Sequence, residues 1–180
     1  SHGVEISGFL STGGSAGGHL ALHYAYSRAD SSPIPPKAVV SYCGPADLAD
    51  EYYYYNEELQ VNNGLGDEEY VSLVLGYASG FPHTYATRAQ AKDALKFVSP
   101  VYYVDGDTVP TVINHGVMDD IVPYRNAVTL DAKLTEYGVE HVLNSYPTSG
   151  HGLELDAENM ALAEQLFWEY IKKYLDSVNV

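Results

Sequence analysis

Ser15 has the sequence surroundings of a catalytic nucleophile. It is the central residue of a G-x-S-x-G pattern formed with Gly13 and Gly17, which lies between a run typical of a strand and a run typical of a helix. In a nucleophile elbow the serine occupies a sharp, strained turn, so small flanking residues are needed to avoid clashes with the neighbouring strand and helix. The hydroxyl then stands above the carboxyl end of the sheet, at the N-terminus of the helix. The pattern therefore predicts nucleophilic chemistry at Ser15.

The same glycine-rich segment has other known uses. A phosphate-binding loop needs lysine after the last glycine, where this chain has His19. A dinucleotide-binding fingerprint needs glycine at its third position, which here is Ser15. Both uses are therefore excluded, whereas a plain glycine-rich turn without chemistry stays open on this segment alone.

Two later loops carry the partners that a serine nucleophile needs, a base and an acid that orients it. In a fold of alternating strands and helices these follow the serine in the order acid, then histidine, each in a loop after a later strand. Asp119, with Asp120 as its rival, lies after the third predicted strand, and His151 lies between two glycines after the fourth. A lone loop histidine is usually without chemistry, but here all three residues occur in the required order. We therefore predict a triad of Ser15, Asp119 and His151.

Short β-rich runs alternate with amphipathic helices along most of the chain. This rhythm predicts an α/β fold with a parallel sheet and helices on both faces. The predicted elements are, in order, strand Gly8–Thr12, helix Ala16–Arg28, strand Lys37–Cys43, strand Pro110–His115, helix Pro123–Gly138, strand Glu140–Tyr146 and helix Asp156–Leu175. Pro123 is placed in the first turn of its helix and Gly138 at its end. Hydrophobic spacing puts Leu20, Ala21 and Tyr24 on one face of the first helix.

Residues 45–98 interrupt this rhythm. We interpret them as a cap-like insertion within a single domain, 1–180, because the segment is short for a core of its own. Two helices are predicted within it, near 67–75 and 87–98, together with the tyrosine run at 52–55. These tyrosines either pack on the body of the domain or line a pocket for an acyl or sugar group.

The overall charge restricts the class of partner. Nine Lys and Arg residues stand against 24 Asp and Glu residues, which gives a formal net charge of −15. Such a surface repels phosphate backbones and anionic lipids, so no nucleic-acid or membrane partner is expected. Because Cys43 is the single cysteine, neither an intrachain disulfide nor a cysteine zinc cluster can form. His19 and His23 are four residues apart, but no Glu follows His19 and no third ligand is evident, so helix packing is expected there rather than metal binding.

Taken together, these motifs resemble the α/β-hydrolase superfamily, in its esterase/lipase and prolyl-oligopeptidase-like branch. The matching stretches are Gly13–Leu22 (GGSAGGHLAL), Tyr42–Leu48 (YCGPADL), Ser99–Val104, His115–Pro123 (HGVMDDIVP) and Gly138–Gly152. The resemblance covers the chain apart from the cap-like insertion. The fold is expected to be partial, with the elbow strand and the three strands after it, because the strands that precede the elbow in the superfamily have no counterpart in this sequence.

The resemblance implies a role for each site residue. Ser15 would be the nucleophile, His151 the general base, Asp119 the orienting acid and the backbone N–H of Ala16 an oxyanion-hole donor. His115 would be a structural residue at a strand end. The superfamily's second oxyanion donor comes from a His-Gly-Gly loop, which is not found in this sequence. No metal or organic cofactor is implied.

The implied function is a serine hydrolase that cleaves small-molecule carboxylic esters through an acyl-enzyme. It would be a carboxylesterase, with acetyl or feruloyl esters of carbohydrates among its candidate substrates. The alternatives are a serine peptidase of the prolyl-oligopeptidase type and an impaired half-domain fragment that acts only with a partner. The strand edge at Gly8–Thr12 is expected to be covered by a second copy or by a preceding N-terminal segment, because bare edges pair with other chains. No signal peptide is recognised, which favours the cytoplasm, but the N-terminus looks truncated and the compartment stays open.

Overall fold

The computed structural model describes residues 6–54, 69, 72 and 88–175. By its internal contacts the chain divides into two compact units, one formed by Ser1–Ala46 with Tyr103–Val180 and the other by Asp47–Tyr102. The first unit contains the sheet and the predicted site residues.

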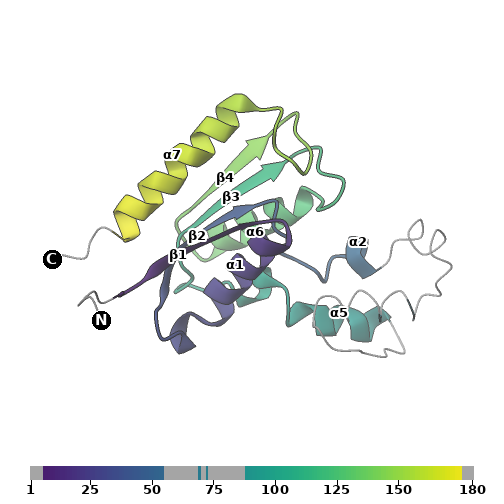
Figure 1. The fold of residues 1–180 in the computed structure, drawn as a ribbon. Coiled ribbons are helices and arrows are strands. Elements are labelled where there is room, and N and C mark those ends of the chain that lie inside the picture. The colour runs from purple at the N-terminus through teal and green to yellow at the C-terminus, as the bar shows by residue number, and fades with distance from the viewer. Residues whose placement is uncertain (1–5, 55–68, 70–71, 73–87, 176–180) are drawn as a thin grey trace. The chain divides into compact units, whose positions relative to one another are not determined.

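Four parallel strands form the sheet of the first unit. They are β1 (Phe9–Gly14), β2 (Pro36–Tyr42), β3 (Thr111–Gly116) and β4 (His141–Tyr146), and they lie side by side in that order (Figure 1). Each predicted strand is confirmed to within two residues at either end. The strands form here because apolar, β-branched residues such as Val40 and Val112 suit strands that are buried on both faces. β1 is an edge strand among the described residues, and the covering of its edge by another chain segment stays a prediction.

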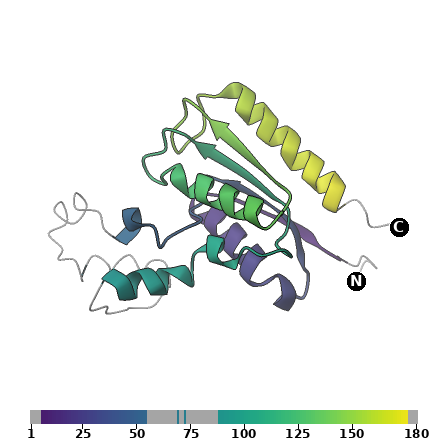
Figure 2. The same cartoon turned by 180° about the vertical axis from the view of Figure 1, so that it is seen from behind.

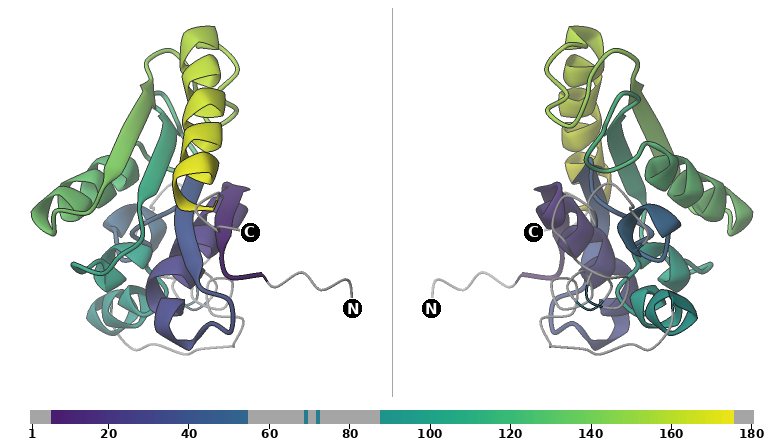
Figure 3. Two further views of the ribbon diagram at one scale, coloured as in Figure 1. Left: turned by 90° about the vertical axis from the view of Figure 1, so that its left-hand side faces the viewer. Right: turned by 90° about the vertical axis from the view of Figure 1, so that its right-hand side faces the viewer.

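Helices lie on both faces of this sheet, as predicted. α1 (Ala16–Ser27), followed by the short 3₁₀ helix η1 (Ala29–Ser31), connects β1 to β2, and α6 (Arg125–Glu136) connects β3 to β4. Right-handed crossovers that step in one direction along a sheet place both helices on the same face (Figure 2). α7 (Ala157–Tyr174) follows β4 and packs on the opposite face from α6 (Figure 3). No helix in the described part of the chain has the length and apolar character needed to cross a membrane.

The core between the sheet and α7 fixes that helix over the strands. Ala38, Val40 and Val112 of β2 and β3 are fully buried, and they contact Leu166 and Tyr170 of α7. Burying one side chain of this size stabilises a fold by roughly 1.5–3 kcal/mol. The position of α7 over the sheet is therefore determined by apolar packing.

The predicted packing face of α1 is partly wrong. Ala21 is buried, but Leu20 is 64% exposed and Tyr24 is 41% exposed. The helix instead buries Gly18, Ala21, Leu22 and Ala25. A Cβ atom on Gly18 would lie 3.0 Å from the Cα of Gly44, which shows how closely the two backbones approach. Hydrophobic spacing does not predict this close approach, which leaves no room for a side chain at Gly18.

The prediction for α6 is wrong at its N-terminal end and confirmed at its C-terminal end. The helix has Tyr124 as its N-cap, so Pro123 precedes the helix and the prediction of a first-turn proline is wrong. Gly138 follows the helix as predicted, with a φ of 68°. The N–H of Val139 donates to the carbonyl of Leu134 at 3.0 Å, a bond that accompanies a left-handed residue at a helix end.

The second unit contains α2 (Glu51–Tyr54) and α5 (Arg88–Lys96), which contact each other; the 3₁₀ helix η2 (Pro100–Tyr103) leads back toward β3. α5 confirms the predicted helix at 87–98, whereas the predicted helix at 67–75 falls almost wholly outside the described residues. The cap-like role of this segment, and a pocket-lining role for its tyrosines, stay predictions.

Candidate active site

Ser15 lies in the turn between β1 and α1 with an unusual backbone conformation. Its φ is 52° and its ψ is −122°, a combination that residues other than glycine rarely adopt. The turn is held by the Ser15 N–H, which donates to the carbonyl of Tyr42, the last residue of β2, at 2.8 Å. Ser15 is the N-cap residue of α1, yet its side chain makes no capping hydrogen bond. Its hydroxyl is thus not committed to the helix end, as a nucleophile requires.

The two glycines of the G-x-S-x-G pattern differ in how their neighbours constrain them. A Cβ atom on Gly13 would clash with the backbone of Gly17, so the close turn requires glycine at position 13. A Cβ atom on Gly17 would meet no atom within 4 Å in the described part of the chain. The expected steric need for glycine is therefore found at Gly13 and not at Gly17 among these residues.

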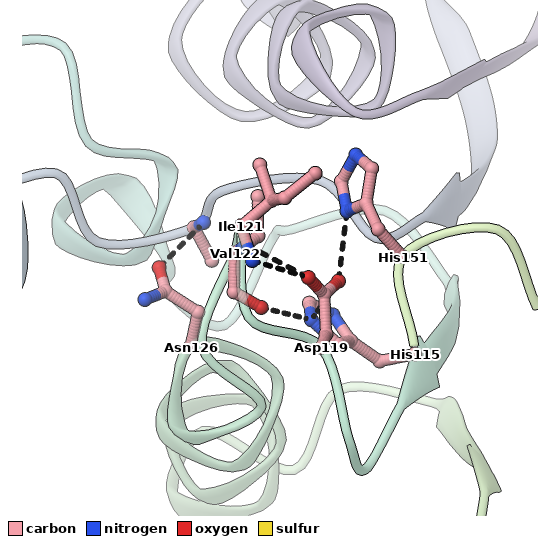
Figure 4. Close-up of polar contacts among 7 residues, drawn as sticks. His115, Asp119, Ile121, Val122, Asn126 and His151 are labelled. Atoms are coloured by element: carbon pink, nitrogen blue, oxygen red, sulfur yellow. Dashed lines mark hydrogen bonds and ion pairs between the residues drawn. The ribbon is translucent and has the colours of Figure 1, made fainter. Parts of the chain in front are cut away.

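Asp119 lies buried in the loop after β3, and hydrogen bonds hold both of its carboxylate oxygens. Oδ1 accepts hydrogen bonds from the N–H groups of Ile121 at 3.0 Å and Val122 at 2.9 Å, and Oδ2 accepts one from His151 Nδ1 at 2.9 Å (Figure 4). Burial acts to raise the pKa of Asp119, but the hydrogen bonds from His151, Val122 and Ile121 outweigh it and hold the pKa below its ordinary value. Asp119 is therefore ionised at neutral pH. Its neighbour Asp120, the rival candidate, is exposed.

The bond to Asp119 determines which nitrogen of His151 carries a proton. A carboxylate can only accept a hydrogen bond, so Nδ1 is the donor, and in the neutral ring Nε2 has a free lone pair. Nε2 points away from Asp119 (Figure 4), and the His151 side chain is 22% exposed. The arrangement leaves His151 able to accept a proton on its accessible side.

A pocket of about 630 Å³ is lined by both Ser15 and His151. Its other walls come from the ends of β1, β2 and β4, from the loop after β4 and from α7: Gly14, Tyr42, Tyr146, Gly152, Leu153, Met160, Ala163, Glu164 and Phe167. The walls are mostly apolar or aromatic, with the carboxylate of Glu164 as an exception. The size and lining are those of a site for a small molecule.

The structure brings some of the predicted site residues into direct contact and places others only around the same pocket. Asp119 and His151 are in direct contact, and Ser15 shares a pocket with His151. The hydrogen bonds of the described residues do not include one between Ser15 and His151. Ala16 is the first residue of α1, where backbone N–H groups have no partner within the helix.

The loop that carries His151 is tied down by Asp156, a residue not singled out from the sequence. Its carboxylate accepts hydrogen bonds from Ser149 Oγ at 2.7 Å, from Thr148 Oγ1 at 2.8 Å and from the Thr148 N–H at 3.0 Å. Asp156 is the N-cap residue of α7, a position at which aspartate usually bonds its own helix, but here it makes no such bond. The sequence signal for Asp156 therefore indicates a helix start, and only the fold reveals its contact with the loop.

Gly116, the last residue of β3, brings the loops of Asp119 and His151 together. A Cβ atom at this position would clash with the backbone carbonyls of Ser149 and Gly150. The absence of a side chain lets the two loops touch through their backbones, which is what places Asp119 within reach of His151.

Within the described residues, one group has the side-chain types of a metal site: Cys43, His115 and Asp119, whose candidate ligand atoms lie within 4.8 Å of one another. Burial raises the pKa of the Cys43 thiol to about 12, and the hydrogen bond from the Gly116 backbone only partly opposes this. The group therefore contains a neutral thiol rather than a thiolate, the form that binds metal. Both oxygens of Asp119 already accept hydrogen bonds, so the group is better described as a hydrogen-bonded cluster.

The comparison with protein families agrees with this geometry. The family model of BD-FAE matches residues 2–134, which is most of the chain. The chain belongs to the BD-FAE family. BD-FAE is an esterase domain of the α/β-hydrolase type, so the superfamily inferred from the sequence motifs is confirmed. No curated protein matches the chain.

Solved structures share this fold at low sequence identity. A truncated carbohydrate esterase from gut microbiota is 21% identical with a TM-score of 0.61, and the match covers 89% of this chain and 59% of that one. A thermophilic esterase from the Planctomycetes species Thermogutta terrifontis is 18% identical, with a TM-score of 0.63 and coverages of 94% and 57%. A puromycin-hydrolysing peptidase from Mycobacterium tuberculosis is 17% identical, with a TM-score of 0.67 and coverages of 96% and 23%. The BD-FAE chain thus spans somewhat more than half the length of the two esterases.

Proposed function

We propose that this BD-FAE chain carries the catalytic residues of a serine hydrolase that cleaves carboxylic esters through an acyl-enzyme. The observation that carries the proposal is the 2.9 Å hydrogen bond between Asp119 and His151, in a site where His151 and Ser15 line the same pocket. Membership of an esterase family and the strained backbone of Ser15 support it.

In the proposed reaction, Ser15 Oγ attacks the ester carbonyl carbon while His151 Nε2 accepts the hydroxyl proton. Asp119 stabilises the imidazolium that forms, and the proton then passes from His151 to the leaving alcohol as the C–O bond breaks. Water, deprotonated by the same histidine, cleaves the acyl-enzyme and restores Ser15. The reactants are the ester and water, and the products are the alcohol and the carboxylic acid.

The developing oxyanion is proposed to accept a hydrogen bond from the backbone N–H of Ala16. This N–H opens α1, where the helix dipole also favours negative charge. An oxyanion-hole donor typically contributes about 10²- to 10³-fold in rate. The short connection from Ser15 to Ala16 places the donor beside the nucleophile.

We propose that the acyl group of the ester enters the pocket beside Ser15. The apolar and aromatic walls favour an uncharged acyl group, and Glu164 disfavours an anionic one. Acetyl and feruloyl esters of carbohydrates both meet this requirement, as do short-chain alkyl esters. The carbohydrate would be the leaving alcohol, outside the acyl pocket.

The decisive test labels the purified protein with a fluorophosphonate and maps the modified residue by mass spectrometry. Labelling at Ser15, together with hydrolysis of p-nitrophenyl acetate, supports the proposal. A panel of acetyl xylan, feruloyl and alkyl esters, with an aminoacyl-β-naphthylamide as a peptidase substrate, then identifies the substrate class. Amide cleavage faster than ester cleavage would indicate the peptidase alternative, and absence of labelling would indicate the impaired fragment.

Replacing Asp156 by alanine is expected to lower kcat/KM for ester hydrolysis by roughly 10- to 100-fold, since a displacement of about 1 Å in a catalytic group has effects of this size. The change removes the hydrogen bonds from Ser149 and Thr148, so the loop with His151 loses its anchor. The control is Glu158→Gln, an exposed residue in the first turn of the same helix. Equal activity of both variants would show that the loop does not depend on Asp156.

Narrowing the pocket is expected to select against large acyl groups. Met160 lines the pocket and is 50% exposed, so Met160→Trp adds bulk without filling the core. We expect kcat/KM for a feruloyl ester to fall by about 10-fold or more relative to an acetyl ester. Leu162→Trp, on the same helix but not lining the pocket, is the control. An equal fall for both esters would place the acyl group elsewhere.

A further inference from the structure

His115, expected from the sequence to be only a structural residue, directly contacts Asp119, the proposed catalytic acid. It lies near the end of β3 with a fully buried side chain. Its Nε2 lies 2.8 Å from the carbonyl oxygen of Val122 and 3.3 Å from Asp119 Oδ2 (Figure 4). The same carboxylate oxygen accepts the hydrogen bond from His151 Nδ1. Two histidines therefore approach one oxygen of Asp119.

The neighbours of His115 determine its tautomer and charge. A carbonyl oxygen and a carboxylate oxygen can only accept, so the proton is on Nε2. The other nitrogen, Nδ1, is buried and has no hydrogen-bond partner. A proton there would be buried without an acceptor, which is unfavourable. Burial lowers the pKa of His115, and the contacts with Val122 and Asp119 only partly oppose this. The ring is thus neutral with a single proton on Nε2.

This one N–H connects the end of β3 to the loop of the acid. The Val122 carbonyl accepts from His115, while the Val122 N–H donates to Asp119 Oδ1. Both backbone polar groups of Val122 are thereby hydrogen-bonded, and both carboxylate oxygens of Asp119 accept hydrogen bonds. The neutral thiol of Cys43 also hydrogen-bonds the Asp119 carboxylate and adds no charge to the cluster. Three side chains from outside the loop therefore approach the carboxylate, those of His115, His151 and Cys43.

We propose that His115 is a positioning residue for the catalytic acid, a neutral imidazole whose Nε2–H holds Val122 and Asp119 so that Asp119 Oδ2 faces His151. This inference rests on the proposed function and adds a fourth side chain to its three. His115 is not among the described residues that line the pocket, so it acts through Asp119 and not on the substrate.

Three substitutions separate the donor from the bulk of the ring. The side-chain amide nitrogen of His115→Gln lies about as far from Cα as the histidine Nε2, so this variant keeps a hydrogen-bond donor at that place. The amide nitrogen of His115→Asn lies instead at the place of Nδ1, where the wild type has no hydrogen-bond partner. His115→Met keeps volume and has no donor. We expect kcat for ester hydrolysis to fall by roughly 10- to 100-fold in the Met and Asn variants, with KM little changed, and the Gln variant to retain most of the activity.

A spectroscopic measurement distinguishes positioning from general support of the fold. The proton shared by Asp119 and His151 should give a far-downfield proton NMR signal in the wild type and in His115→Gln. The signal should be weakened or lost in His115→Met and His115→Asn, while circular dichroism shows that these variants are folded. An unchanged signal and kcat in the Met variant would overturn the inference, as would a Gln variant as impaired as the Met variant.

The wild-type protein provides a test that does not depend on how the variants fold. With ¹⁵N-labelled histidine, His115 should remain the neutral Nε2–H tautomer between about pH 5 and pH 8. A proton on Nδ1, or titration within this range, would overturn the inference. These NMR signals are read without substrate, so a protein inactive on esters would defeat the proposed function while the role of His115 is still tested.

Discussion

Replacing Ser15 by alanine is expected to lower kcat/KM for p-nitrophenyl acetate by roughly 10⁴- to 10⁶-fold, the range found when a serine nucleophile is removed. Alanine has no hydroxyl to attack the carbonyl, and Ser15 is the one serine among the described residues that line the pocket with His151. The residual rate would come from substrate binding and from the proposed oxyanion donor, the N–H of Ala16. Fluorophosphonate labelling should be lost in the same variant.

The matched control for this variant is Ser7→Ala, an exposed serine that precedes β1. It should react with the fluorophosphonate and hydrolyse the ester as the wild type does. If the Ser15→Ala protein turned over the ester as fast as this control, Ser15 would not be the nucleophile and the proposed function would fail.

Replacing Asp119 by asparagine is expected to lower kcat by about 10⁴-fold, the effect of the same change in a serine protease triad. An asparagine amide can donate to His151 Nδ1, which would move the ring proton to Nε2 and remove the lone pair that accepts the serine proton. Asp120→Asn, the neighbouring exposed acid, is the control and should keep its activity. A larger loss in the Asp120 variant would reverse the assignment of the acid.

The same asparagine variant has an expected effect on acid stability. Hydrogen bonds hold the folded-state pKa of Asp119 below its ordinary value of about 3.9, so its ionisation stabilises the fold above that pH and this stabilisation is lost as the pH falls through the folded-state pKa. The Asn variant lacks this group. Its Tm, measured by circular dichroism, should therefore decline less steeply than that of the wild type below about pH 4. Parallel declines would show that Asp119 is not linked to folding.

Much of the fold and of the candidate site follows from local sequence patterns. The four strands and three main helices of the sheet unit were recognisable because apolar runs and helical spacing are local properties. Asp119 and His151 were recognisable because parallel strands end at one edge of a sheet, so loops after successive strands meet there. The requirement for glycine at position 13 was recognisable because the clash that excludes a side chain there involves Gly17, a residue of the same turn.

The features missed in the sequence depend on contacts between distant segments. The roles of His115 and Asp156 require knowing which loop each side chain faces, and Asp156 carries a local signal for a different role, that of a helix cap. The exposed Leu20 and Tyr24 show the same limit, because hydrophobicity alone does not reveal how closely α1 approaches the sheet. The spacing of residues along the sequence identifies candidates for chemistry, whereas their distances in the folded structure show which of them can act together.

The backbone conformation of Ser15 has a consequence for protein engineering. A non-glycine residue at a φ of 52° and a ψ of −122° costs the folded state roughly 1–3 kcal/mol, and glycine would relieve most of that cost. A directed-evolution campaign that selects only for heat resistance would therefore favour glycine at position 15, and with Ser15 as the proposed nucleophile its best survivors would be inert. Libraries built on this scaffold need position 15 fixed, or a selection that couples survival at high temperature to turnover.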